Sequence, residues 1–368
     1  MVVPGDRKSC LRRINILICF LALMTGLLSC NRQTSLSPSE ENLVIFPPPP
    51  AATRVQFLTH ISGSTDMVRQ KGRFHQYLFG KEEPRILVKP YGITVHQNRI
   101  YICDTGQGGL VIIDLLHGTF ETWIPGGRGQ LQLPVNCCLD EKGNLYVADA
   151  SRRQVVIFDQ EMRFLQAVGD AEGFKPTDVL VRQDTLYVVS VQEHGLHLYS
   201  TITYDHLGVL SGGDSGTEGF VRQPTNMAMA GNQLYISDFG DFNVKKVSTD
   251  GQFEGRIGSY GNGPGQFTRP KGLDLDREGN LYVVDAAFQN VQIFNPQGQL
   301  LMYFGGGYNG PGAMWLPAGI AISYENLDYF RPYVDEHFEL KYLIFVTNQY
   351  GPAKISVYGF VEEKVTGP

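Results

Sequence analysis

The chain has 368 residues, a formal net charge of −6 at pH 7, 42 Gly, 20 Pro, 18 Tyr and 21 Phe. This mixture favours short strands joined by tight turns over long helices. An acidic chain is a poor partner for nucleic acid, and beyond residue 30 no stretch is apolar for long enough to span a bilayer.

The first thirty residues predict a secretory leader. Four Lys or Arg residues within 7–13 precede an almost unbroken apolar run at 14–28. A run of ~15 residues is short for a membrane span and typical of a signal peptide. It ends in Leu-Leu-Ser-Cys at 27–30, which resembles the lipobox of bacterial lipoproteins; an ordinary signal peptide that stops at a cysteine is the alternative. The resemblance implies that 1–29 is removed and that Cys30 becomes a lipidated, palmitate-bearing N-terminus.

Residues 30–52 are predicted to be a tether between the lipid and the folded body. The segment is polar and serine-rich at first and then contains four consecutive prolines at 47–50, which favour the extended polyproline conformation. Asn31 after the lipidated cysteine resembles an outer-membrane rather than an inner-membrane sorting signal. Loss of the leader removes four basic residues and one acidic residue, so the mature net charge becomes −9.

A repeat occupies the chain from residue 87 onward. Each unit contains a short apolar stretch, a turn, a phrase such as Asn-Leu-Tyr-Val-Ala-Asp at 144–149, and two further apolar stretches. A period in the forties with four short strands predicts a β-propeller, in which neighbouring blades bury each other's faces. The phrase is then a second-strand packing signature, and its closing Asp is expected to cap the next turn rather than to catalyse. Each of the six units opens with a proline, at intervals of 42 to 48 residues: Pro90, Pro134, Pro176, Pro224, Pro270 and Pro317.

The sixth unit predicts how the ring closes. It supplies three strands, near 318–322, 343–348 and 354–358, and then the sequence offers no clear fourth strand. A candidate for the missing strand lies at 54–61, where the sequence resembles the fourth strands of the other units. We expect this N-terminal strand to complete the last blade, because closure removes the open edges that would template aggregation.

A short helix is predicted near 64–80, between the closing strand and the first full blade. Ser64 or Thr65 is suited to cap its N-terminus, and Gly80 is suited to end it. Met67, Phe74 and Leu78 lie at compatible spacing, which predicts that the helix packs on the propeller; a membrane-surface role is the alternative.

An aromatic insertion at 324–341 separates the first two strands of the sixth blade. Most of the corresponding turns are much shorter, so this segment is a candidate for a specific role. Tyr is enriched among residues that dominate binding interfaces, and we hypothesise that Tyr329, Phe330 and Tyr333 contact a partner. A lid that packs over the end of the channel is the equal alternative.

Residues 85–360 resemble NHL repeats. The closest matches are Gly-Asn-Gly-Pro-Gly-Gln-Phe-Thr-Arg-Pro at 261–270 and Gly-Asn-Leu-Tyr-Val-Val-Asp at 279–285. The segments 329–335 and 346–352 look typical of bacterial six-bladed NHL-type lipoproteins. The resemblance implies an all-β, six-bladed propeller of the NHL or TolB-like type. It implies most often an interaction platform, although some six-bladed relatives are enzymes, so the fold alone does not decide the function.

The enzymatic relatives predict metal ligands that this sequence does not offer at the expected positions. Lactonase-like relatives place oxygen ligands at the start of the first strands, where this chain has Tyr91, Val135, Thr177, Thr225, Lys271 and Ala318. Amidating-lyase-like relatives hold zinc with histidines at blade starts, and none of the eight histidines lies at such a position. We therefore predict no metal, no cofactor and no catalytic residue.

One polar constellation remains at the channel. The second residue after each opening proline is Asn136, Asp178 or Asn226 in blades two, three and four, and glycine in the other three blades. Because these positions lie near one end of the channel, the three polar groups can converge on a ligand or ion. The alternative is that they bond to backbone groups between blades.

The sequence therefore predicts a signal peptide at 1–29, a lipidated tether at 30–52 and a monomeric six-bladed propeller at 53–368. We expect an outer-membrane lipoprotein that faces the periplasm or the cell surface and binds an envelope protein or a ligand without catalysis. The alternative is a metal-dependent hydrolase or lyase, lactonase-like or amidating-lyase-like, with its site at the mouth of the central channel.

Overall fold

The computed structural model describes residues 43–70, 83–169 and 172–364. The predicted signal peptide, Cys30 and most of the predicted tether lie outside these residues, as does the part of the predicted helix at 71–80. Contacts divide the chain into two units, Met1–Leu43 and Val44–Pro368, and all the strands below belong to the second. Within the described residues, no helix has the length and apolar character needed to cross a membrane.

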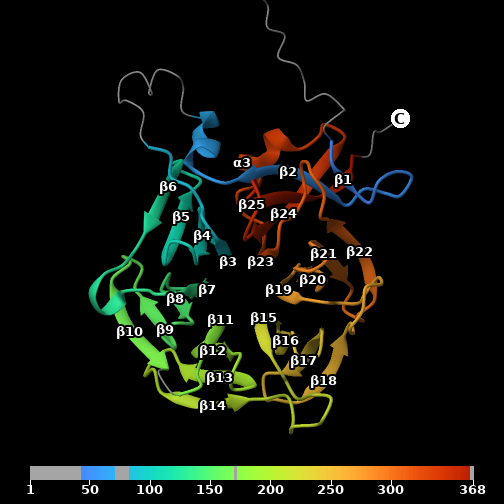
Figure 1. Ribbon diagram of the computed structural model, residues 1–368. Coiled ribbons are helices and arrows are strands. Elements are labelled where there is room, and N and C mark those ends of the chain that lie inside the picture. Colours follow the sequence, from blue (N-terminus) through green and yellow to red (C-terminus); the bar gives the residue numbers. More distant parts are fainter. Residues whose placement is uncertain (1–42, 71–82, 170–171, 365–368) are drawn as a thin grey trace, which may run out of the picture. The chain divides into compact units, whose positions relative to one another are not determined.

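The strands form six antiparallel sheets arranged around a ring, which confirms the six-bladed propeller (Figure 1). In blades one to five the strands lie side by side in chain order, with the first strand nearest the centre of the ring. Blade one contains β3 (Pro90–His96), β4 (Arg99–Asp104), β5 (Gly109–Asp114) and β6 (Thr119–Trp123). Blade two contains β7 (Pro134–Leu139), β8 (Leu145–Asp149), β9 (Gln154–Phe158) and β10 (Phe164–Gly169).

The next three blades repeat this pattern. Blade three contains β11 (Pro176–Arg182), β12 (Thr185–Ser190), β13 (Gly195–Ser200) and β14 (His206–Leu210). Blade four contains β15 (Pro224–Ala230), β16 (Gln233–Asp238), β17 (Asn243–Ser248) and β18 (Phe253–Ile257). Blade five contains β19 (Pro270–Leu275), β20 (Leu281–Asp285), β21 (Asn290–Phe294) and β22 (Leu300–Gly305). Every first strand begins at the proline that the repeat marks.

Blade six joins the two ends of the propeller unit. Its sheet has the order β1–β2–β25–β24–β23. The predicted closing strand is β2 (Val55–Ile61), and it pairs with β25 (Ile355–Glu363), which follows β24 (Phe338–Asn348) and β23 (Pro317–Ser323). A fifth strand was not predicted: β1 (Ile45–Phe46) pairs with the start of β2, inside the segment assigned to the tether. The ring of Phe46 packs 6.3 Å from that of Phe304, which explains why this apolar pair joins the blade.

The repeated phrase packs as expected of a second strand. In β8, Leu145 and Val147 join a cluster with blade one, whereas Tyr146 and Ala148 join a cluster with blade three. Alternate side chains of one strand therefore bury themselves against opposite neighbours. The closing Asp149 accepts backbone hydrogen bonds from the turn, as predicted, and also from the link that precedes its own blade, at 2.6 Å from Gln132 N and 3.0 Å from Leu133 N.

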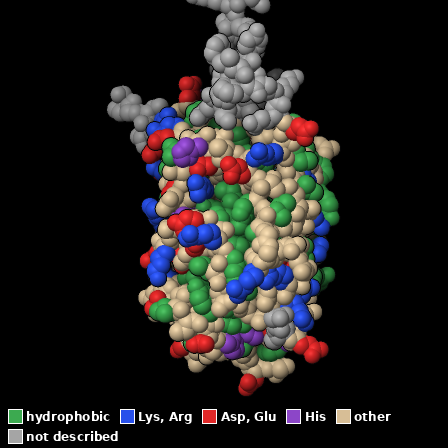
Figure 2. Space-filling view, turned by 90° about the vertical axis from the view of Figure 1, so that its left-hand side faces the viewer, with side chains coloured by type: hydrophobic (Ala, Val, Ile, Leu, Met, Phe, Trp, Pro, Cys, Tyr) green, Lys and Arg blue, Asp and Glu red, His purple; other side chains and the backbone are tan. Residues whose placement is uncertain are grey.

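The two segments that interrupt the repeat contain short helices. In the described part of the first, Ser64–Gln70 forms a 3₁₀ helix, η3, and Asp66, rather than the predicted caps Ser64 or Thr65, accepts a hydrogen bond from the backbone N–H of Ser62. The insertion forms α3 (Leu327–Phe330) and η5 (Arg331–Tyr333), and its last residues belong to β24. On the side of the ring that carries β6 and β10, charged side chains of both signs are mixed with exposed hydrophobic ones (Figure 2).

Candidate functional site

The ring of second residues after the opening prolines surrounds the centre of the propeller. In each first strand the pairing register shifts just after the proline. Such an irregularity changes the direction in which the next side chains point. In blades two, three and four the pairing resumes at Asn136, Asp178 and Asn226. In blades one, five and six the glycine is skipped and the pairing resumes one residue later. The ring thus has a polar half and a glycine half.

The polar half is organised around the carboxylate of Asp178, which is 5% exposed. Asn136 Nδ2 and the backbone N–H of Val179 donate to Asp178 Oδ1 over 2.5 and 2.8 Å. The backbone N–H of Met227 in the next blade donates to Oδ2 over 2.7 Å. Burial raises the pKa of Asp178 to about 7, although these bonds and one from Asn226 act to lower it. The structure therefore brings the predicted trio together as a network that joins three blades.

Two polar atoms of this half are buried and unpaired among the described residues. They are Asn226 Oδ1 and Thr177 Oγ1. Asn226 is 2% exposed, whereas the corresponding Oδ1 of Asn136 accepts from the backbone N–H of Cys137 over 3.0 Å. Buried polar atoms of this kind are usually satisfied by ordered water or by a ligand. Asn226 Oδ1 in the ring, and Thr177 Oγ1 one residue before Asp178, thus have bonding capacity left for a bound molecule.

The ring does not fit the oxygen-ligated cation that a lactonase-like reaction requires. Such cations take six or more oxygen ligands, several of them carboxylates, but both oxygens of Asp178 already accept hydrogen bonds from the protein. The other half of the ring supplies glycine. Across residues 43–70, 83–169 and 172–364, no group of three or more His, Cys, Asp or Glu side chains is placed to hold a metal ion.

The glycine half brings backbones of neighbouring blades into direct contact. A Cβ atom on Gly272 would meet Ala318 O at 2.5 Å, and one on Gly319 would overlap the carbonyl oxygen of Tyr91. Thr347 Oγ1 donates to Tyr91 O over 2.5 Å and accepts from Gly319 N over 2.8 Å, which fastens blade six to blade one. This half therefore leaves no room for side chains at the level of the ring.

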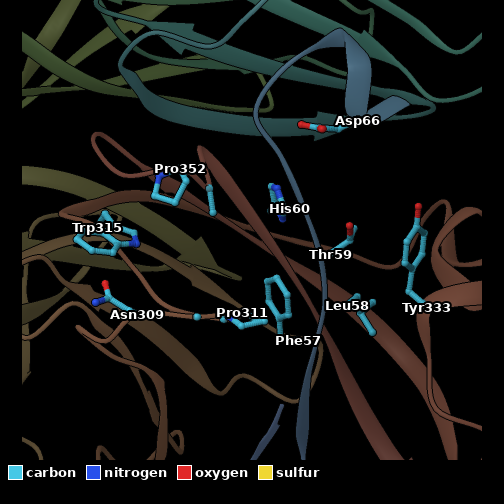
Figure 3. Close-up of a pocket in the computed structure, with 13 residues that line it drawn as sticks. Phe57, Leu58, Thr59, His60, Asp66, Asn309, Pro311, Trp315, Tyr333 and Pro352 are labelled. Carbon is cyan, nitrogen blue, oxygen red and sulfur yellow. The ribbon is translucent and has the colours of Figure 1, made fainter. Parts of the chain in front are cut away.

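A cavity of about 600 Å³ lies at the closing blade, away from the channel. Its walls come from β2, η3, the link at 309–315, the turn at 352–353 and the aromatic insertion. Phe57 lies between Trp315 and Tyr333 in this view, and His60, Asp66 and Asn309 supply polar groups (Figure 3). Aromatic walls with a few polar groups and a volume of this order are typical of ligand pockets.

The three aromatic residues predicted to bind a partner have different environments. Tyr333 lines the cavity, and its carbonyl accepts from the buried Gln56 Nε2 over 3.0 Å. Phe330 is 1% exposed and packs edge-on against Phe345, so in this structure its side chain supports the insertion from beneath and is not offered at the surface. Tyr329 is half-buried against Phe330.

Sequence reasoning did not identify Phe57, His60 or Trp315 as site residues. Phe57 and His60 belong to the N-terminal closing strand, and Trp315 to the link that enters the last blade. Each looked like an ordinary member of the repeat. Only the pairing of β2 with β25 places them beside Tyr333. The signal that could have found the site is the presence of aromatic residues at both ends of the repeat, which ring closure brings together.

Comparison with known proteins supports the fold. Residues 217–326 match the model of a family described as 6-bladed beta-propeller, DUF5128. No curated protein matches the sequence. Among solved structures, a protein of unknown function from Bacteroides thetaiotaomicron has a TM-score of 0.57 at 15% identity over 84% of this chain and 76% of its own. An auxiliary nutrient binding protein from the same organism has a TM-score of 0.55 at 14% identity over 75% and 70%.

A gluconolactonase from Xanthomonas campestris is also similar, with a TM-score of 0.53 at 13% identity over 85% of this chain and 90% of its own. At such identities the likeness extends to the fold alone. A binding protein and an enzyme therefore share the architecture, and the function has to be argued from the site.

Proposed function

We propose that this chain is a lipid-anchored propeller of the bacterial cell envelope, of the NHL type, that binds a ligand or a partner protein without catalysis. The binding site is the cavity of blade six, and the observation that carries the proposal is its aromatic lining by Phe57, Trp315 and Tyr333. Trp and Tyr contribute much of the binding energy at interfaces, and pockets of this composition are usually preformed.

The position of the cavity supports this role. Its main wall is β2, which is held by β25 on one side and by β1 over its first residues on the other. Gln56 fixes the insertion from this wall, since its side chain accepts from Asp335 N at 3.1 Å as well as donating to the carbonyl of Tyr333. A site built on paired strands keeps its aromatic groups in place before binding, which lowers the entropy lost when a ligand is held.

A hydrolase or lyase centred on the channel is the second candidate. It is favoured by one observation: Asp178, with a pKa near 7, lies in the same ring as two unpaired oxygens, and carboxyl groups with such a pKa are candidates for general acid–base work. Against it, the oxygens of Asp178 point into bonds that hold blades two, three and four together. The hydrogen bonds of Asp178 are therefore those expected of a residue that stabilises the fold.

A single-tryptophan chain tests the binding site. The protein has two tryptophans, so Trp123→Phe leaves Trp315 in the cavity as the only indole reporter. We expect peptides or glycans from the envelope that enter the cavity to change its fluorescence saturably. Tyr333→Ala should weaken this response, and Tyr303→Ala, at a 56% exposed position on β22, should not. Loss of lactone or ester hydrolysis in Asp178→Asn, with no response from Trp315, would favour the enzyme instead.

The anchor requires a separate test. Cys30→Ser removes the thiol that would carry the lipid, so we expect the chain to move from the membrane fraction to the soluble fraction and to lose labelling by palmitate. Cys138→Ser, in the propeller, serves as the matched control because that thiol lies in strand β7. Unchanged membrane association of the Cys30 variant would contradict the lipid anchor while leaving the binding site untested by that result.

A further inference from the structure

Blade three carries two histidines whose ring nitrogens face each other near its outer edge. His197 on β13 is 9% exposed, and His206 at the start of β14 is exposed. His197 Nδ1 lies 3.3 Å from His206 Nε2. This distance is slightly longer than most N–H hydrogen bonds. It equals the separation of two ligand nitrogens on a tetrahedral zinc ion, which is about 3.3 Å for metal–nitrogen distances near 2.0–2.1 Å.

The other nitrogen of His197 lies beside a carboxylate. His197 Nε2 is 2.9 Å from Glu193 Oε2, although its direction makes no hydrogen bond to that oxygen. The same carboxylate oxygen accepts from Ser190 Oγ over 3.1 Å. A negative charge this close favours the tautomer with the proton on Nε2, which leaves the lone pair of Nδ1 available to a metal ion. Metal-binding histidines almost always have such a partner on their second nitrogen.

The surrounding residues hold the pair in place. The ring of Phe174 packs edge-on against His197 at 5.0 Å, and Tyr199 lies 5.1 Å from His206. Blade three is also unusual in its second strand, where Ser190 replaces the capping aspartate of most blades. Ser190 Oγ keeps one capping bond, from Lys175 N at 3.1 Å, and donates to Glu193. The replacement of the capping aspartate by Ser190 thus provides a hydrogen-bond donor for Glu193, the carboxylate that lies beside His197.

We propose that His197 Nδ1 and His206 Nε2 bind a divalent first-row transition metal ion, with Glu193 as the partner that orients His197. Among the described residues, no third His, Cys, Asp or Glu completes the group. Because His206 is exposed, a metal ion held by these two nitrogens would take its remaining ligands from water or from another molecule. This site is independent of the cavity in blade six and of the channel.

Zinc titration of the metal-free full chain tests the proposal. We expect one equivalent of Zn²⁺ to bind and to raise the Tm, as any ligand selective for the folded state does. His206→Gln should weaken binding at least tenfold, and Glu193→Gln should weaken it by about 10 to 100-fold, the usual effect of losing an outer partner. His117→Gln is the control, because His117 is exposed and lies beside Asp114 in another blade.

A second readout separates ligation from a structural effect. Co²⁺ in a site with nitrogen ligands gives a visible absorption band, which should disappear in His206→Gln while the circular dichroism of the propeller is retained. Because His206 is exposed, this variant is expected to fold normally. Absence of saturable Zn²⁺ binding by the native chain, or equal affinity in the native chain and in His206→Gln, would overturn the proposal.

Discussion

The two halves of the channel ring close the propeller in different ways. In blades five, six and one, the glycines let backbones touch, and Thr347 fastens the contact. In blades two, three and four, Asn136, Asp178 and Asn226 fill the same positions, and both asparagines hydrogen-bond to Asp178, although Asn226 Oδ1 is left unpaired. The comparison shows that a polar cluster in a propeller channel can replace glycine as a way to join blades. It is therefore weak evidence for catalysis by itself.

The largest effect is expected in the glycine half. Gly319→Ala places a methyl group against the carbonyl oxygen of Tyr91 and the Cα of Gly92, both parts of the backbone. Overpacking of this kind costs about 1–3 kcal/mol, and more where neighbours cannot move. We expect the free energy of unfolding, measured by denaturant titration, to fall by about 3 kcal/mol. Gly126→Ala is the control, since no described heavy atom lies within 4 Å of its Cβ position.

The polar half should be nearly as sensitive when its centre is removed. Asp178→Ala leaves Asn136 Nδ2 and the backbone N–H groups of Val179 and Met227 without their acceptor. Each buried donor left unsatisfied costs about 1–3 kcal/mol, and partial relaxation limits the total to about 2–3 kcal/mol. The same denaturant titration checks this. An unchanged stability with lost enzymatic turnover would mean that Asp178 serves chemistry instead of the fold.

The pH dependence of the free energy of unfolding distinguishes the two halves, because only the polar half of the ring contains a titrating side chain, Asp178. The pKa of Asp178 is raised from 3.8 to about 7. Between these two pH values the folded chain keeps a proton on Asp178 that the unfolded chain has released. The contribution of Asp178 to the free energy of unfolding is therefore complete below about pH 4 and is lost as the pH rises to about 7.

Asp178→Asn isolates that contribution. Asp274, whose pKa burial raises to about 6, adds a slope of the same sign in both chains. The difference in unfolding free energy between the native chain and the variant should therefore change steadily between pH 4 and pH 7. A constant difference across that range would show that Asp178 is ionised in the folded protein throughout.

The smallest effect is expected from a pair of threonines, one in each half. Thr177 Oγ1 has no partner among the described residues, so Thr177→Val should change the free energy of unfolding by less than about 1 kcal/mol, and in the stabilising direction. Thr347→Val removes the bonds to Tyr91 O and Gly319 N and should cost about 2 kcal/mol. Equal effects of the two substitutions would show that a bound molecule or water contributes as much at Thr177 as the protein does at Thr347.

The sequence predicted the parts of the fold that repeat. The prolines fixed the start of every first strand, and the missing strand of the sixth unit was found at β2. What does not repeat was harder to predict. The strand β1 has two residues beside a run of prolines, so its pairing depends on Phe304 and on the edge of β2 rather than on its own pattern.

The site was predictable to the extent that it follows the repeat. Asn136, Asp178 and Asn226 share one repeat position, and they meet as expected. The cavity of blade six joins Phe57 to Trp315 and Tyr333, from which it is separated by most of the chain. Their proximity is a consequence of ring closure. Aromatic content also did not separate Tyr333, which faces the cavity, from Phe330, which is buried among core residues.

Closure by the N-terminal strand also sets the order in which the protein can fold. His60 pairs with Ser356, so β2 waits for almost the entire chain before its partner β25 is available. Contacts this distant in sequence are slow to form. Blades one to five can assemble as their strands emerge, whereas the cavity exists only after the final strand arrives. The capacity to bind at blade six therefore reports that the whole propeller has been made.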